Sequence, residues 1–209
     1  MGTTVLLIAL TILLSNFSNA AKPPDIPHFK FLKIKAPDEC KIFFHALWRG
    51  TQQGATFEEI EYFKEAVRLV QLDCSNLEIE ELPQCIGSLV NLRILKLKRN
   101  RLQSLPKEIG NLKFLGHLNL SYNQLEELPC EVGRLENLIG LNVKNNKLET
   151  VPEEIGGLRL MALLNLANNN ISHLPLSLGL LTNLRRVKLK GNPFGSKAQL
   201  QNLMKLLKR

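Results

Sequence analysis

A 23-residue repeat runs through most of the chain and limits what it can fold into. Six segments align without gaps, and they begin at Leu69, Leu92, Leu115, Leu138, Met161 and Leu184. They follow the pattern LxxLxLxxNxLxxLPxxIGxLxx, and the first five copies have a proline at repeat position 15 and a glycine at position 19. A fixed period of this length indicates a solenoid, in which each repeat is one supersecondary unit stacked on its neighbours.

The apolar positions of the repeat predict a short strand in every copy. Positions 4 and 6 alternate with polar residues, which is typical of a strand with one buried face. One repeat cannot bury that face alone, so we expect the strands to stack side by side in a parallel sheet. The side chains expected to point into the core are Leu95, Leu97, Leu118, Leu120, Leu141, Val143, Leu164 and Leu166.

Two further positions predict how the chain turns. Proline at position 15 favours an extended segment at the start of the outer, convex side. Asparagine at position 9 follows the strand, and its amide can both donate and accept hydrogen bonds in a buried turn. Stacked copies would link neighbouring turns in a ladder of the side chains Asn100, Asn123, Asn146, Asn169 and Asn192.

These residues resemble the leucine-rich repeat family, in its 23-residue form with Leu-Pro in mid-repeat. That form is similar to the repeats of Ras-suppressor, scribble, erbin and plant Ras-group proteins, and the resemblance covers residues 69–194. It implies an α/β solenoid, a leucine-rich repeat horseshoe with a short parallel sheet on the concave side. It also implies a non-catalytic module for protein binding, acting as a scaffold or in signal transduction.

The rest of the chain divides around the repeats. Residues 37–68 carry helix-capping patterns and are predicted to form an N-terminal helical cap. Residues 69–194 hold five full repeats and a partial one, and 195–209 are predicted to form a C-terminal capping helix. Residues 21–36 read as a linker. The first repeat has Cys74 and Leu77 at positions 6 and 9, as expected of a terminal copy that meets a cap.

Residues 1–20 resemble a signal peptide. The apolar run from Val5 to Leu14 is shorter than the ~20 residues that span a bilayer, and small residues at Ser18 and Ala20 fit a cleavage site. We therefore expect a secreted or endomembrane protein, with no transmembrane span in the mature chain. Two observations oppose this. Residues 1–20 contain no Lys or Arg, and the paired-cysteine cap of extracellular family members is absent. An uncleaved anchor or a cytoplasmic chain stays open.

Catalytic and metal-binding patterns are absent from the sequence. Cys40, Cys74, Cys85 and Cys130 show no zinc spacing, and there is no phosphate loop or nucleophile elbow. We expect no enzymatic activity, no cofactor and no metal. Cys74 is interpreted as a small apolar side chain, with a reactive thiol as the alternative. Aromatic residues make up only 6% of the chain, which disfavours a nucleic-acid partner bound by base stacking.

The concave face, defined here as repeat positions 2, 3, 5, 7 and 8, is the candidate binding site. It is basic in the second and sixth repeats, and small and amide-rich between them. The chain carries a net charge of +8, so a protein partner with an acidic surface is expected, and a hydrated, non-binding face is the alternative. The predicted partner-binding residues are Arg93, Lys96, Lys98, Arg99, Asn119, Tyr122, Asn142, Asn165, Arg185, Arg186, Lys188 and Lys190.

Two glycosylation sequons connect the compartment with this face. They are Asn119-Leu120-Ser121 and Asn170-Ile171-Ser172. In a secretory chain, a glycan on Asn119 would fill the concave curve. The alternative function is accordingly a secreted or surface recognition protein that binds an anionic ligand, such as a sulfated glycan or an acidic protein.

Overall fold

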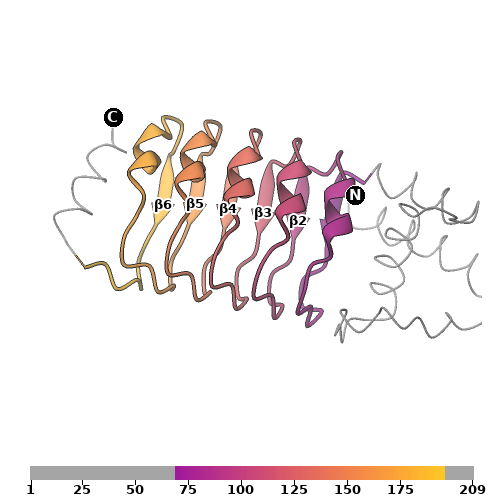
Figure 1. Cartoon of the computed structure of the whole chain (residues 1–209), viewed down its shortest axis with the longest axis horizontal. Coiled ribbons are helices and arrows are strands. Elements are labelled where there is room, and N and C mark those ends of the chain that lie inside the picture. Colours follow the sequence, from indigo (N-terminus) through magenta and orange to yellow (C-terminus); the bar gives the residue numbers. More distant parts are fainter. Residues whose placement is uncertain (1–68, 196–209) are drawn as a thin grey trace, which may run out of the picture.

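The computed structural model describes residues 69–195, which form a stack of six coils (Figure 1). Each coil contributes one three-residue strand: β1 (Gln71–Asp73), β2 (Ile94–Lys96), β3 (His117–Asn119), β4 (Gly140–Asn142), β5 (Leu163–Asn165) and β6 (Arg186–Lys188). Short 3₁₀ helices lie on the opposite side: η2 (Gln84–Ser88), η3 (Lys107–Asn111), η4 (Cys130–Arg134), η5 (Glu153–Gly157) and η6 (Leu176–Leu180). The predicted signal peptide, linker and N-terminal cap lie outside the described residues, as does the predicted C-terminal helix apart from Gly195.

The six strands form one parallel sheet in the order β1-β2-β3-β4-β5-β6. The register pairs every residue with the one 23 positions further along, for example Leu95 with Leu118 and Lys96 with Asn119. Each repeat position therefore forms a straight row across the sheet. This arrangement confirms the predicted solenoid with its sheet on one side.

The core is a single column of aliphatic side chains between the sheet and the 3₁₀ helices. It runs without interruption from Leu72 in the first repeat to Leu184 in the last. All eight side chains predicted to point inward are at most 2% exposed, which confirms the strand pattern. Burial of this kind is the main driving force for stacking, because no single repeat has a core of its own.

The position-9 asparagines form the predicted ladder. The Nδ2 of Asn123 donates to the carbonyls of Leu120 and Leu97, both at 2.9 Å, and its Oδ1 accepts the N–H of Leu102 at 3.1 Å. Leu120 belongs to the same repeat as Asn123, whereas Leu97 and Leu102 belong to the preceding one. The other four asparagines, from Asn100 to Asn192, make the same set of bonds. Each amide thus closes its own turn and the turn before it.

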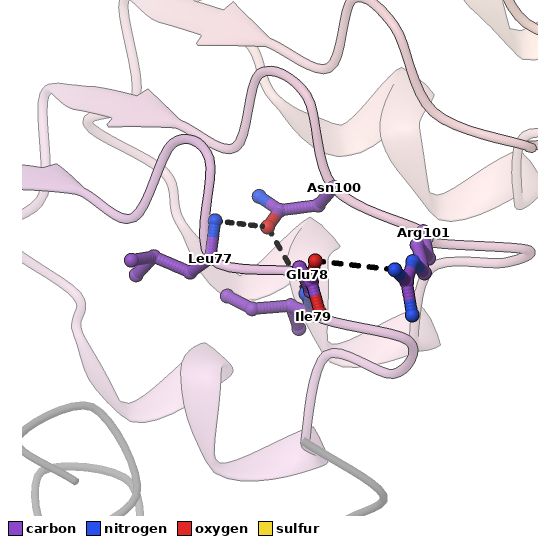
Figure 2. A network of polar contacts seen from close by, with 5 residues as sticks. All are labelled: Leu77, Glu78, Ile79, Asn100 and Arg101. Atoms are coloured by element: carbon purple, nitrogen blue, oxygen red, sulfur yellow. Dashed lines mark hydrogen bonds and ion pairs between the residues drawn. The ribbon is translucent and has the colours of Figure 1, made fainter. Parts of the chain in front are cut away.

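This direction explains why the first repeat needs no asparagine. Its turn is closed by Asn100 of the second repeat, whose Oδ1 accepts the N–H groups of Leu77 and Ile79 at 3.0 Å (Figure 2). Arg101 adds an ion pair with Glu78 at 3.2 Å. Within its own repeat, a position-9 amide in the first copy would only add a second donor to the Cys74 carbonyl, which Asn100 already reaches at 2.8 Å, and the sequence pattern has no preceding repeat for it to serve. Leu77 instead packs half-buried against the core.

The convex side depends on the recurring proline and glycine. Each position-15 proline is extended, with φ between −64° and −70°, and immediately precedes a 3₁₀ helix. The extended segment confirms the prediction, whereas the helix after it was not predicted. Position-19 glycines let successive 3₁₀ helices approach closely: a Cβ on Gly133 would lie 2.5 Å from the Glu154 carbonyl oxygen. Any other residue there would force the two repeats apart.

Replacing one rung of the ladder should destabilise the stack. Asn123→Ala removes the acceptor of the buried Leu102 N–H and one donor from each of two carbonyls, so we expect the free energy of unfolding to fall by about 2–3 kcal/mol. Asn137→Ala is the control, because Asn137 is exposed and donates a single bond to the Lys113 carbonyl. It should cost less than about 1 kcal/mol. Urea unfolding measures both, and equal losses would contradict the role assigned to the ladder.

Candidate functional site

Strand side chains at positions 3 and 5 point away from the core and line a shallow hollow of about 440 Å³. The hollow crosses β2 to β6, and we call it the concave groove. Half of the predicted partner-binding residues line it, namely Lys96, Asn119, Asn142, Asn165, Arg186 and Lys188. The strand register brings these six together, because equivalent positions of successive repeats lie side by side.

The other predicted residues do not line the groove and lie at its two edges. Position 2, occupied by Arg93 and Arg185, precedes the strands. Positions 7 and 8 follow the strands, and this second edge carries Lys98, Arg99, Tyr122 and Lys190. The predicted residues therefore divide into six on the groove floor and six along its two edges.

Charge is strongly segregated on the repeats. The concave face holds nine Lys or Arg residues and one acid, Asp73, whereas the other eleven acids of the repeats occupy other positions. Asp73 was absent from the predicted site because only the later repeats were considered. It pairs with Lys96 at 3.3 Å. Burial opposes its ionisation, but hydrogen bonds from Ser75 and Lys96 outweigh that effect and hold the pKa of Asp73 below its usual value.

A row of amides on the groove floor is oriented by the backbone. The Oδ1 atoms of Asn119, Asn142 and Asn165 accept the N–H of the residue two positions on, at 3.1 to 3.2 Å. Such a turn fixes the orientation of each amide, with its oxygen toward the backbone and its nitrogen toward the groove. The three Nδ2 groups make no hydrogen bond within residues 69–195 and are left as donors. Together with the cations, they make this face rich in donors and poor in acceptors.

Tyr122 gathers three cations at the edge that follows the strands. Its ring centroid lies 5.5 Å from the guanidinium of Arg99 and 5.7 Å from the ammonium groups of Lys98 and Lys144. The negative face of an aromatic ring attracts cations at this range. Tyr122 therefore offsets part of the repulsion between like charges that come from the second and fourth repeats. We call these four residues the Tyr122 cluster.

The backbone is left-handed at position 8 in all six repeats, with φ from 55° to 80°. In four copies the residue at this position is one that tolerates a positive φ, namely Asn76, Asn145, Asn168 or Gly191. The other two are Arg99 and Tyr122, whose side chains disfavour the conformation. Sequence reasoning missed this feature, although the predominance of Asn and Gly in the column was a signal. The two strained residues are both members of the Tyr122 cluster.

The floor at the middle of the concave face carries no Lys or Arg, and apolar side chains lie beside its amides. Leu163 in β5 and Ile139 beside β4 are 45% and 42% exposed, respectively. Gly140 lies between His117 and Leu163 in the strand register, and its missing Cβ would meet the His117 ring at 2.8 Å. The imidazole therefore leans over β4, and the floor positions of β3 to β5 carry no Lys, Arg, Asp or Glu.

Both cysteines of residues 69–195 that have a shifted pKa, Cys85 and Cys130, are made less acidic. Burial raises the pKa of Cys85 to about 12, and Cys74 is 1% exposed in the core, as expected of a small apolar side chain. A hydrogen bond from the Cys130 thiol to Glu131 raises the pKa of Cys130. In this part of the chain, no three His, Cys, Asp or Glu residues are grouped to hold a metal ion. Its helices are also all too short to cross a membrane.

Comparison with known proteins identifies the family. The family model described as leucine-rich repeat region matches residues 52–208. The chain therefore belongs to the leucine-rich repeat family, whose fold generally serves non-catalytic protein interaction. The Leu-Pro subtype stays a prediction. No curated protein matches the chain.

Solved structures agree on the solenoid fold. A leucine-rich repeat protein of Leptospira interrogans is 35% identical, with a TM-score of 0.65 over 73% of this chain and 37% of that one. An internalin of Listeria monocytogenes shares 20% identity and a TM-score of 0.61 over 73% of this chain and 42% of its own. The BIR2 ectodomain of Arabidopsis thaliana shares 24% identity and a TM-score of 0.52 over 59% and 67%. This chain spans little more than a third of the Leptospira protein.

The strain at position 8 can be measured. Arg99→Gly should raise the free energy of unfolding by about 0.5–1 kcal/mol, because glycine accepts a positive φ without steric cost. Lys98→Gly is the matched control: it also removes one cation from beside Tyr122, but Lys98 has no positive φ. It should lower stability by about 0.5–1 kcal/mol. Opposite signs in urea unfolding are the expected result, and a loss of stability in both variants would contradict the strain.

Proposed function

We propose that this chain is a non-catalytic module that binds an acidic region of a protein partner through its concave face, as a scaffold or in signal transduction. The observation that carries the proposal is the composition of that face. It combines nine cations with one acid, and its floor amides turn their oxygens inward. A surface that offers donors and positive charge is complementary to carboxylates and carbonyl oxygens.

The shape of the groove supports a macromolecular partner. The hollow spans five strands and is open along its length, so it can contact an extended surface. A catalytic site would instead need several reactive groups that converge in one cleft. Residues 69–195 bring no metal-ligand group together, and each shifted cysteine pKa moves away from reactivity. These features favour binding over catalysis.

Site-specific cross-linking tests the binding face. A photo-reactive amino acid at Asn142, on the groove floor, should cross-link a protein partner in cells that make this chain. Replacing Lys96, Arg99, Arg186 and Lys188 with alanine should reduce the adduct at least tenfold. Raising the salt concentration should reduce it as well, because exposed charges are screened.

The matched control carries the photo-reactive group at Arg134 in η4, on the convex side. It should give little adduct, and the four alanine substitutions should not change its yield. Stronger cross-linking from Arg134, or an Asn142 adduct that resists both the substitutions and salt, would contradict the proposed face.

A second candidate function follows from the compartment. We propose that the chain enters the secretory pathway, where the same face would bind an anionic ligand outside the cytoplasm. The sequon at Asn170 is exposed. At the other sequon, the Asn119 oxygen accepts hydrogen bonds from both the backbone N–H and the hydroxyl of Ser121. Of the two sites, Asn170 is the better placed for modification, and a glycan there would leave the groove floor open.

Mass spectrometry of the native protein separates the two compartments. A secretory chain should begin at Ala21 and carry a glycan that an N-glycosidase removes. Asn170→Gln should abolish that mass shift, whereas Asn119→Gln should leave it unchanged. A chain that begins at Met1 or Gly2 without any glycan would contradict the secretory assignment and favour the cytoplasmic one.

A further inference from the structure

We infer that the concave groove binds a single extended peptide segment whose acidic side chains form two clusters, separated by a short apolar centre. This inference rests on the proposed function and specifies its partner. It comes from how charge is distributed on the concave face: cations lie at both ends of the groove and along one edge as far as Lys144, whereas the floor of β3 to β5 has none. The peptide would run across the strands, along the rows that the register creates.

The first basic end is the Tyr122 cluster, which lies in repeats two to four on the edge of the groove that follows the strands. Lys98, Arg99 and Lys144 have no acidic partner within the described part of the chain, and the Tyr122 ring keeps them close together. Lys96 of the second repeat differs, because Asp73 already pairs with it. A group of unpaired cations held in place by one ring is prepared for an anionic group, since little side-chain freedom is lost on binding.

The second end is the last repeat, which carries Arg185, Arg186, Lys188 and Lys190 and no acid. Arg186 and Lys188 line the groove directly. Neighbouring strands are about 4.8 Å apart. The Tyr122 ring is three strand steps from the last repeat, about 14 Å, and Lys98 and Arg99 are four steps from it, about 19 Å, whereas Lys144 is two steps away. An extended chain advances about 3.3 Å per residue and covers about 14–19 Å in four to six residues.

The centre decides the nature of the occupant. Leu163 projects from β5 with 45% of its surface exposed, beside Gly140 and the exposed Ile139. A continuous polyanion would place charge over these apolar groups, and the floor positions of β3 to β5 carry no Lys or Arg to pair with it. A peptide can place apolar side chains there instead. Its carbonyl oxygens can also accept hydrogen bonds from the Nδ2 groups of Asn119, Asn142 and Asn165. These donors need such acceptors once the peptide excludes water from the floor.

Two labelled peptides of identical composition test the spacing on the full-length protein. The spaced peptide is Asp-Asp-Leu-Ser-Leu-Ser-Asp-Asp, in which the acidic pairs lie about 20 Å apart when extended. The clustered peptide is Asp-Asp-Asp-Asp-Leu-Ser-Leu-Ser. Fluorescence anisotropy at low salt should show at least tenfold tighter binding of the spaced peptide. Replacing both leucines of the spaced peptide with serine should weaken it at least threefold.

Charge reversal locates the second contact. Arg186→Glu combined with Lys188→Glu should weaken the spaced peptide at least tenfold and change the clustered peptide by less than threefold, because that peptide still engages the Tyr122 cluster. The matched control is Lys107→Glu combined with Lys147→Glu. It makes the same change in net charge at exposed positions outside the concave face and should leave both affinities unchanged.

The possible outcomes distinguish a failure of the two-cluster inference from a failure of the proposed function on which it rests. Equal affinity for the two peptides, still lost on reversal at the concave face, would overturn the two-cluster inference and leave acidic binding intact. The same inference falls if a heparin octasaccharide competes with the spaced peptide at a lower concentration than the unlabelled peptide itself. Binding that only the Lys107 and Lys147 reversals reduce, or no binding of either peptide, would overturn both.

Discussion

The hydrogen bonds of one amide side chain set the geometry on which everything else depends. Each position-9 asparagine closes its own turn and the turn of the repeat before it. Two consecutive repeats can therefore stack in only one register, and a shift by a single residue would leave buried backbone groups without partners. The straight rows of the sheet follow from this register. So does the concave face: Lys98 and Lys144, 46 residues apart in sequence, approach the same ring, and Lys96 and Lys188, 92 residues apart, lie at opposite ends of one surface.

The groove combines features that oppose one another energetically. Clustered cations repel one another, and the left-handed backbone conformation of Arg99 and Tyr122 costs conformational energy. The structure offsets the first through the Tyr122 ring and through the pair formed by Lys96 and Asp73. Solvation compensates the remaining charge, since Arg99, Arg186 and Lys188 are exposed. Binding is most favourable when an acceptor-rich partner replaces the water around these cations and amides, and such a partner would contact both the floor and the edges of the groove.

Periodicity made the core, the strands and the asparagine ladder predictable, because each depends only on which residue types recur at which spacing. Leu118 and Asn123 could be placed from the sequence for this reason. The left-handed turn at Arg99 and Tyr122 was indicated only indirectly, by the Asn and Gly residues at the same position of other repeats. Its direct cause is backbone bonding between repeats, such as the bond from the Tyr122 N–H to the Lys144 carbonyl. The inward orientation of the Asn142 oxygen and the convergence of Lys144 on Tyr122 depend on side-chain rotamers, which no spacing specifies.

The one-way hydrogen bonding of the ladder also bears on how such a chain can change length. An internal copy carries the amide that its predecessor needs and receives the amide of its successor, so duplicating it in a gene inserts a complete coil. The first copy is different, because Leu77 offers nothing to a coil placed before it. Duplicating that copy would place a leucine where a carbonyl and an N–H of the coil before it require an amide. Lengthening by internal duplication is therefore open to this protein, whereas its first coil is fixed at the start of the array.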